Sequence, residues 1–283
     1  MELEFLTAVV EGNCTLVDAI LNRGVYIDTS LSSFGNTALM IAAGKNHVQL
    51  VDLLLSRGAY VDMRHDGNTA LMIAAGKNHV QVVDLLLSRG ANVDAKTFYD
   101  GTVLMRAVYN GHIHVVERLL MRGVNIEAMD RDGKTALMYA VCNGHIQIID
   151  LLLLCGANVE TWDMYGQTAL IIAAWFGHIQ IIDLLLSRGA DGNTIDQDGT
   201  TALMRAAGKK SYTCRRLASF SQSQGRSDES EYGLNGSDVV DLIKRRIIIR
   251  NERNEEHVRK CLVENVRDAH VFTDLIPSIA SFL

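Results

Sequence analysis

Residues 35–59 read GNTALMIAAGKNHVQLVDLLLSRGA, and residues 67–91 repeat this stretch with one difference, Leu50 against Val82. The two copies belong to a longer series. A Thr-x-Leu core recurs at intervals of 32, 33, 33, 33 and 33 residues, at Thr37, Thr69, Thr102, Thr135, Thr168 and Thr201. A degenerate earlier copy lies in residues 1–28, where LVDAILNRGVYID aligns with LVDLLLSRGAYVD 34 residues later. A fixed period of this length indicates an array of stacked units.

Each unit contains the pattern of two short helices. In residues 133–160, apolar residues at helical spacing predict a first helix from about Thr135 to Cys142 and a second over HIQIIDLLLLCG, ending at Gly156. Between the helices lies a position suited to left-handed backbone, which is Gly in later units and Asn46 or Asn78 in the duplicated ones. The remainder of the unit is a turn-rich connector. One pair cannot bury its apolar face alone, so neighbouring pairs must stack.

The stretch DGKTALMYAVCNGHIQIIDLLLLCGANVE (132–160) resembles an ankyrin repeat in its T-x-L-x-x-A opening, its Gly-His pair and its LL-x-x-G-A-N close. The resemblance implies an all-α fold: a solenoid of helix-turn-helix units joined by short hairpin connectors. The opening tetrapeptide departs from the family's Thr-Pro-Leu-His and reads Thr-Ala-Leu-Met, and Pro277 is the only proline. In its low proline content and near-duplicate repeats, the chain resembles ankyrin proteins of intracellular bacteria or large viruses.

The period divides the chain into repeats and a C-terminal segment. In the last repeat, a Ser-, Gln- and Gly-rich stretch at 211–236 interrupts the pattern between TALMRAAGKK and SDVVDLIKRR, and its composition predicts a disordered insertion. The charged residues that follow predict capping helices, because the open end of a stack needs a polar face. The expected divisions are 1–34 (degenerate repeat), 35–66, 67–99, 100–132, 133–165, 166–198, 199–246 (interrupted repeat) and 247–283 (cap).

The charge, the cysteines and the hydropathy of the sequence favour a soluble cytoplasmic protein. The net charge is −6, and residues 1–208 carry 14 basic against 22 acidic side chains, so no basic surface for nucleic acid is expected. The five cysteines are scattered, which argues against a disulfide framework. No signal peptide or membrane-spanning run is recognised. We expect a monomer with no membrane association. The alternative to a cytoplasmic location is secretion into a host cell as an effector.

No pattern in the sequence predicts catalysis or a cofactor. A nucleophile elbow, a phosphate-binding loop and paired Cys/His motifs are all missing. One histidine recurs at the start of each second helix, at His47, His79, His112, His145 and His178. Helices packed about 8–10 Å apart hold such side chains too far from one another to share a zinc ion. We therefore expect a structural ladder, no metal, no cofactor and no enzyme.

The aromatic residues single out one part of the array. Eight of the seventeen fall within residues 98–176: Phe98, Tyr99, Tyr109, Tyr139, Trp162, Tyr165, Trp175 and Phe176. Four of them lie on connector tips (Phe98, Tyr99, Trp162 and Tyr165), and three occupy variable positions just before the Gly-His pair (Tyr109, Trp175 and Phe176). Residues that are aromatic in only some copies are expected to point outward, where Trp and Tyr act as binding hot spots. Packing against neighbouring loops is the alternative. Arg106 and Arg205 lie on first helices and could add polar contacts.

The resemblance implies a non-catalytic scaffold that binds a partner protein through its hairpin tips and the concave face of its first helices. On this interpretation the duplicated repeats are scaffold, and specificity lies in residues 98–176. The alternative function is an adaptor that recruits a target to host ubiquitin-ligase machinery through the C-terminal tail, because LIPSIASFL (275–283) faintly resembles C-terminal motifs attached to ankyrin arrays.

Overall fold

The computed structural model describes residues 2–31 and 35–206. Within these residues the chain forms six helix pairs, and residues 202–206 begin a further helical turn. The predicted all-α solenoid of helix-turn-helix units is confirmed. The insertion at 211–236, the second half of the interrupted repeat, the cap at 247–283 and the C-terminal tail lie outside the described residues.

The helices are short and nearly equal in length. The first helices of the pairs are α1 (Glu2–Glu11), α3 (Ala38–Gly44), α5 (Ala70–Gly76), α7 (Val103–Tyr109), α9 (Ala136–Cys142) and α11 (Ala169–Phe176). The second helices are α2 (Cys14–Asn22), α4 (Val48–Ser56), α6 (Val80–Ser88), α8 (Ile113–Met121), α10 (Ile146–Leu154) and α12 (Ile179–Ser187).

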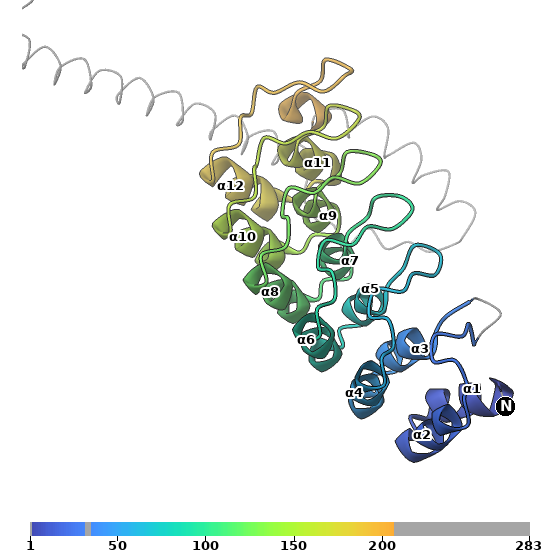
Figure 1. The fold of residues 1–283 in the computed structure, drawn as a ribbon. Coiled ribbons are helices and arrows are strands. Elements are labelled where there is room, and N and C mark those ends of the chain that lie inside the picture. Colours follow the sequence, from blue (N-terminus) through green and yellow to red (C-terminus); the bar gives the residue numbers. More distant parts are fainter. Residues whose placement is uncertain (1, 32–34, 207–283) are drawn as a thin grey trace, which may run out of the picture.

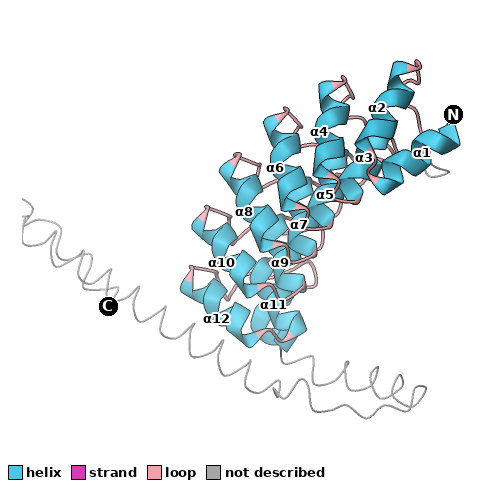
Figure 2. Cartoon of the chain, turned by 90° about the horizontal axis from the view of Figure 1, so that it is seen from below, coloured by secondary structure: helices cyan, strands magenta, loops and turns pink. Residues whose placement is uncertain are grey.

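The pairs stack side by side in chain order (Figure 1), so that first helices form one row, second helices form another, and the connectors project together beyond the first row. Seen from below (Figure 2), the stack is curved, with the second helices along its outer edge and the first helices along its inner edge. Most connectors are hairpins closed by a single β-bridge, such as Lys96 with Thr102 and Trp162 with Thr168.

The turn between paired helices adopts the conformation that the sequence predicts. Gly111, Gly144 and Gly177 have φ angles of 73°, 72° and 74°, and the duplicated repeats place Asn46 and Asn78 there at 62° and 61°. Asn tolerates left-handed backbone better than most residues other than Gly. The Gly-to-Asn exchange therefore preserves the turn.

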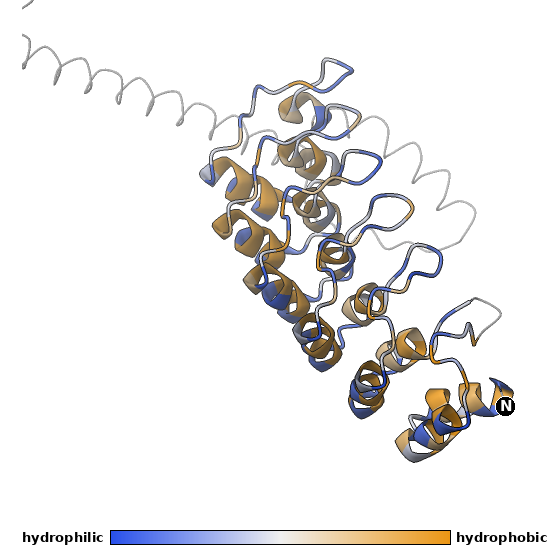
Figure 3. Ribbon diagram, in the orientation of Figure 1, coloured by the Kyte–Doolittle hydropathy of each residue, from blue (hydrophilic) through white to orange (hydrophobic). Residues whose placement is uncertain are grey.

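The core consists of aliphatic side chains from both rows of helices, and Figure 3 shows hydrophobic colour on the helices against hydrophilic colour on the hairpins. Small alanines such as Ala74 and Ala107 are wholly buried in the first row, where they permit close helix approach. Leu50 and Val82, the single difference between the duplicated stretches, are both completely buried. The two copies thus differ in their core and share the same surface in this stretch.

Each first helix from α3 to α11 begins with a threonine cap. The hydroxyl oxygens of Thr37, Thr69, Thr102, Thr135 and Thr168 each accept a hydrogen bond from the amide three residues later. This bond replaces the intrahelical partner that the first turn of any helix lacks. The Thr-x-Leu core of the sequence is therefore a helix start.

Thr69 is fully buried, with 3.3 Å between its Oγ1 and the amide of Met72, and it offers a test of the cap. We expect Thr69→Val, which keeps the shape but loses the hydroxyl, to lower the free energy of unfolding by about 1 kcal/mol. Thr69→Ser keeps the hydroxyl and should recover the cap bond. Urea titrations followed by circular dichroism measure both variants, and equal stability of Thr69→Val and the wild type would show that the bond contributes nothing.

Two ladders of hydrogen bonds join successive repeats. In the first, ring Nε2 atoms lie 3.0–3.4 Å from carbonyl oxygens of the preceding repeat, in the pairs His47–Val10, His79–Gly44, His112–Gly76 and His145–Tyr109. In the second, carboxylates at the end of one repeat accept an amide of the next, as Asp94 does from Asn125 at 2.9 Å and Glu127 from Asn158 at 2.8 Å. The recurring histidine thus contacts backbone of the neighbouring repeat.

Ion pairs connect the second helices along the outer edge. They join Arg57 to Asp18, Arg89 to Asp52, Arg118 to Asp84 and Arg188 to Asp150. Among the described residues no such pair links α8 to α10, because Cys155 stands where most repeats have arginine, and Glu117 pairs with His114 of its own helix at 3.2 Å. Exposed ion pairs of this kind contribute only about 0–1 kcal/mol each.

Candidate interaction surface

The aromatic residues singled out by the sequence lie on hairpins and at the ends of first helices. Seven of the eight are exposed, in agreement with the expectation that they point outward: Phe98, Tyr99, Tyr109, Trp162, Tyr165, Trp175 and Phe176. Tyr139 is the exception, because it packs against the core and its hydroxyl donates to Asp130 at 2.6 Å. Burial, that hydrogen bond and the charge of Asp130 raise the pKa of Tyr139, so its hydroxyl remains protonated.

Three of the tyrosines line one groove. It has a volume of about 610 Å³ and extends across the ends of α5, α7 and α9 and the hairpins between them. Tyr99 comes from a hairpin, Tyr109 from the end of α7 and Tyr139 from α9. The groove is also lined by Ile73, Gly76, Lys77, Thr97, Gly101, Thr102, Met105, Arg106, Asn110 and Asp130.

Contacts between neighbouring repeats hold the tyrosines in place. The rings of Tyr109 and Tyr139 meet edge to face, with 6.1 Å between their centroids. The guanidinium of Arg131 lies over the ring of Tyr99, 5.2 Å from its centroid, and donates to the carbonyl of Phe98 at 2.8 Å. Such contacts restrict ring motion, so a partner would meet side chains that are already positioned.

Arg106 lies half-buried in the groove, and its side chain crosses the backbone of the preceding repeat. A Cβ placed on Gly76 would meet the Cδ of Arg106 at 2.9 Å, so a glycine there leaves the space that the arginine stem occupies. The guanidinium donates to Oδ1 of Asn68 at 2.6 Å. Burial lowers the pKa of Arg106 from its usual value, which reflects the loss of water around the charge.

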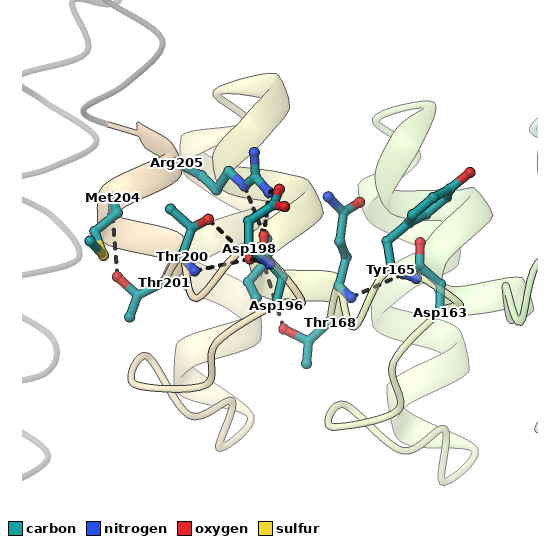
Figure 4. Close-up of polar contacts among 11 residues, drawn as sticks. Asp163, Tyr165, Thr168, Asp196, Asp198, Thr200, Thr201, Met204 and Arg205 are labelled. Atoms are coloured by element: carbon teal, nitrogen blue, oxygen red, sulfur yellow. Dashed lines mark hydrogen bonds and ion pairs between the residues drawn. The ribbon is translucent and has the colours of Figure 1, made fainter.

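A second, smaller hollow of about 230 Å³ lies farther along the inner row, lined by Tyr165, Gln167, Trp175, Gln197, Asp198 and Arg205. The guanidinium of Arg205 lies over the ring of Trp175, 5.4 Å from its centroid. Arg205 also donates twice to Asp196, at 2.5 and 2.8 Å, and once to Asp198 at 2.7 Å (Figure 4).

Asp196 is the buried centre of these contacts. Its Oδ1 accepts hydrogen bonds from the amide and hydroxyl of Thr200 and from the amide of Asp198, while Oδ2 faces Arg205. Burial alone would raise the pKa of this carboxyl, but the hydrogen bonds from Thr200 and the guanidinium of Arg205 outweigh it and hold the pKa below 3.8. Asp196 is therefore charged at neutral pH.

The remaining aromatic residues line neither hollow. Phe98 lies over Gly67 of the preceding hairpin, where a Cβ would meet the Phe98 amide nitrogen at 2.7 Å. Trp162 forms its hairpin bridge with Thr168, and the ring of Phe176 stacks on His178 with 5.7 Å between centroids. The predicted residues are thus separated into two hollows and three individual sites.

Sequence reasoning missed part of this surface. The duplicated repeats are predicted to be scaffold, and the structure adds that Ile73, Gly76 and Lys77 of the second copy line the groove. Tyr26 and Tyr60, in the first and second repeats, are also exposed. The absence of a side chain at Gly76 was the available signal, since it creates space that the next repeat fills.

Among residues 2–31 and 35–206, no three His, Cys, Asp or Glu side chains gather as they would around a metal ion. Cys14, Cys142 and Cys155 are free thiols, and burial raises the pKa of Cys142. None of the helices in the described part of the chain is both long and apolar enough to span a membrane.

The stacked helix pairs and their hairpins define a repeat protein with an open inner surface. A family model described as ankyrin repeats matches residues 5–97 and 104–196, and the chain belongs to the ankyrin-repeat family. No curated protein sequence matches the chain.

Two solved structures show the same architecture. The ankyrin repeat domain of Bcl-3, described as a unique member of the IkappaB protein family, is 29% identical, with a TM-score of 0.67, over 71% of this chain and 92% of that domain. The human ASB11 ankyrin repeat domain is 23% identical, with a TM-score of 0.65, over 86% of this chain and 96% of that domain. The second likeness is one of fold alone.

Proposed function

We propose that the chain is a non-catalytic protein-binding module that holds a partner protein against its hairpins and its inner row of first helices. The observation that carries the proposal is the group of exposed aromatic residues within residues 98–176. Tyr and Trp provide large, rigid contact areas and dominate the energetics of protein interfaces. Ankyrin-repeat proteins generally mediate protein–protein interaction, and membership of the family supports this assignment.

The geometry also supports an extended contact with several repeats. The two hollows and the individual sites at Phe98, Trp162 and Phe176 lie on successive repeats, so a partner that covers them would span the first row from α5 to the helical turn at 202–206. Solenoids offer extended surfaces of this kind because each repeat presents the same side.

The test is affinity capture from a cell extract with the full chain and a Trp162→Ala/Trp175→Ala variant. Each tryptophan that a partner buries as a hot spot contributes about 2 kcal/mol or more. We expect a protein bound by the wild type to be recovered at least about tenfold less with the double variant.

A Tyr26→Ala/Tyr60→Ala variant is the matched control, because both side chains are as exposed as the tryptophans and lie in other repeats. It should capture the partner as the wild type does. Circular dichroism must show equal helical content in all three proteins. Equal recovery by the tryptophan variant and the wild type would show that Trp162 and Trp175 do not contribute to the interface.

The adaptor function stays a prediction from the sequence, since the tail at 275–283 lies outside the described residues. Deleting residues 270–283 should abolish only the contact with a ligase subunit and leave capture through the repeats unchanged.

A further inference from the structure

Arg106 has more hydrogen-bond donors than partners. A guanidinium carries five N–H donors, and the structure gives this one a single acceptor, Oδ1 of Asn68. In the described part of the chain no carboxylate forms an ion pair with Arg106, and burial is the one cause of its shifted pKa. A half-buried guanidinium without a counter-charge is costly, and an incoming anion would relieve that cost.

Arg205, the counterpart of Arg106 in a later repeat, has the carboxylate partners that Arg106 lacks. It stands 99 residues after Arg106, three 33-residue periods away, and it binds the carboxylates of Asp196 and Asp198. The residues at the same positions relative to Arg106 are Thr97 and Tyr99. One arginine of the array therefore has two carboxylates from its own hairpin, and its counterpart has none.

The space for such an anion lies directly beside Arg106. The groove of about 610 Å³ is lined by the arginine, by the exposed rings of Tyr99 and Tyr109, and by the aliphatic side chains of Ile73 and Met105. Lys77 adds a second positive charge; its Nζ donates to the carbonyl of Gly44 at 2.9 Å and keeps two donors. Asp130, the acid in the lining, accepts hydrogen bonds from the hydroxyl of Tyr139 and the backbone amide of Lys134.

We propose that this groove binds a carboxylate side chain of the partner protein, with Arg106 receiving the carboxylate and the tyrosines packing against apolar residues on either side of it. The inference rests on the proposed protein-binding function and names the chemistry of the segment that is bound. A single carboxylate between apolar residues fits better than a long acidic run, because residues 1–208 carry a net charge of −8 (14 basic, 22 acidic) that repels negative charge at longer range.

The test measures binding of the full chain to two pools of short synthetic peptides by fluorescence polarisation. One pool has Asp at its centre between varied apolar residues, and the other has Asn there. A charge-assisted hydrogen bond to a guanidinium should favour the Asp pool by about tenfold or more. Arg106→Met keeps the aliphatic stem that lies over Gly76, and it should abolish this preference.

Arg122→Met is the matched control, since it removes an equally positive but exposed side chain at the end of α8, on the outer row. It should retain the wild-type preference for Asp. Equal binding of the Asp and Asn pools, or an unchanged preference in Arg106→Met, would overturn the carboxylate inference. A partner captured through the tryptophans would still support the proposed function in that case.

A further outcome concerns the chain's own acids. If the wild type binds neither pool but Asp228→Asn/Glu229→Gln/Glu231→Gln binds the Asp pool, the occupant is a segment of the same chain, which overturns the assignment to a partner. If neither protein binds either pool, the inference is wrong. The tryptophan experiment then decides separately whether the chain binds a protein at all.

Discussion

We expect Leu104→Ala to lower the free energy of unfolding by about 2–5 kcal/mol. Leu104 is 0% exposed in the first turn of α7, a helix that packs between the first helices of the preceding and following repeats. Alanine leaves a cavity there that short, hydrogen-bonded helices cannot close, so the transfer free energy of the lost atoms and the cost of the cavity add together. Urea denaturation followed by circular dichroism gives the change in free energy.

The control for this substitution is Leu154→Ala at the end of α10, where the side chain is 68% exposed. The same chemical change there should cost no more than about 0.5 kcal/mol. A loss for Leu104→Ala as small as that of the control would mean that the centre of the stack does not pack as described.

Removing the Arg205 side chain should cause the second largest loss of unfolding free energy among these substitutions. Arg205→Met leaves the carboxylate of Asp196, a residue only 5% exposed, without its positive partner, and breaking a buried pair in this way costs about 3 kcal/mol. The loss should depend on pH. Asp196 has a folded-state pKa below its ordinary 3.8, so its stabilisation is complete above that value and disappears as the pH falls through the lower folded pKa.

The difference in unfolding free energy between wild type and Arg205→Met should therefore be largest at neutral pH and shrink as Asp196 becomes protonated. Arg106→Met provides the comparison, because the same arginine position in that repeat lacks a carboxylate partner. It should show a smaller loss and no corresponding dependence on pH. If Arg205→Met loses no more stability than Arg106→Met, or if its loss is independent of pH, the ion pair with Asp196 does not stabilise the fold.

The parts of the structure that depend on local sequence could be predicted. The Thr-x-Leu core places the helix start because the cap and its amide lie three residues apart, and Asn46 could be assigned to the left-handed turn from its alignment with Gly111. The outward direction of Trp162 and Tyr165 followed from comparing copies, since a core position must stay small or aliphatic in each.

The features that depend on contacts between a helix and a hairpin or a neighbouring repeat could not be predicted. Arg106 and Arg205 look alike in sequence, and they differ because one hairpin supplies two carboxylates and the other supplies Thr97 and Tyr99. Tyr139 packs against the core, and its hydroxyl donates a hydrogen bond to Asp130 in the hairpin before α9. The groove exists partly because Gly76 lacks a side chain in a repeat that looks like a plain copy of its predecessor.

Among the described residues, the joint between α8 and α10 lacks the ion pair that connects the other neighbouring second helices. At this joint Cys155 stands where most repeats have arginine, and Glu117 pairs with His114 of its own helix. On the opposite edge of that joint, Tyr109 of one repeat and Tyr139 of the next form the wall of the groove. Residues that set this joint apart therefore lie on both edges of the array, with Cys155 on the outer edge and the two groove tyrosines on the inner edge.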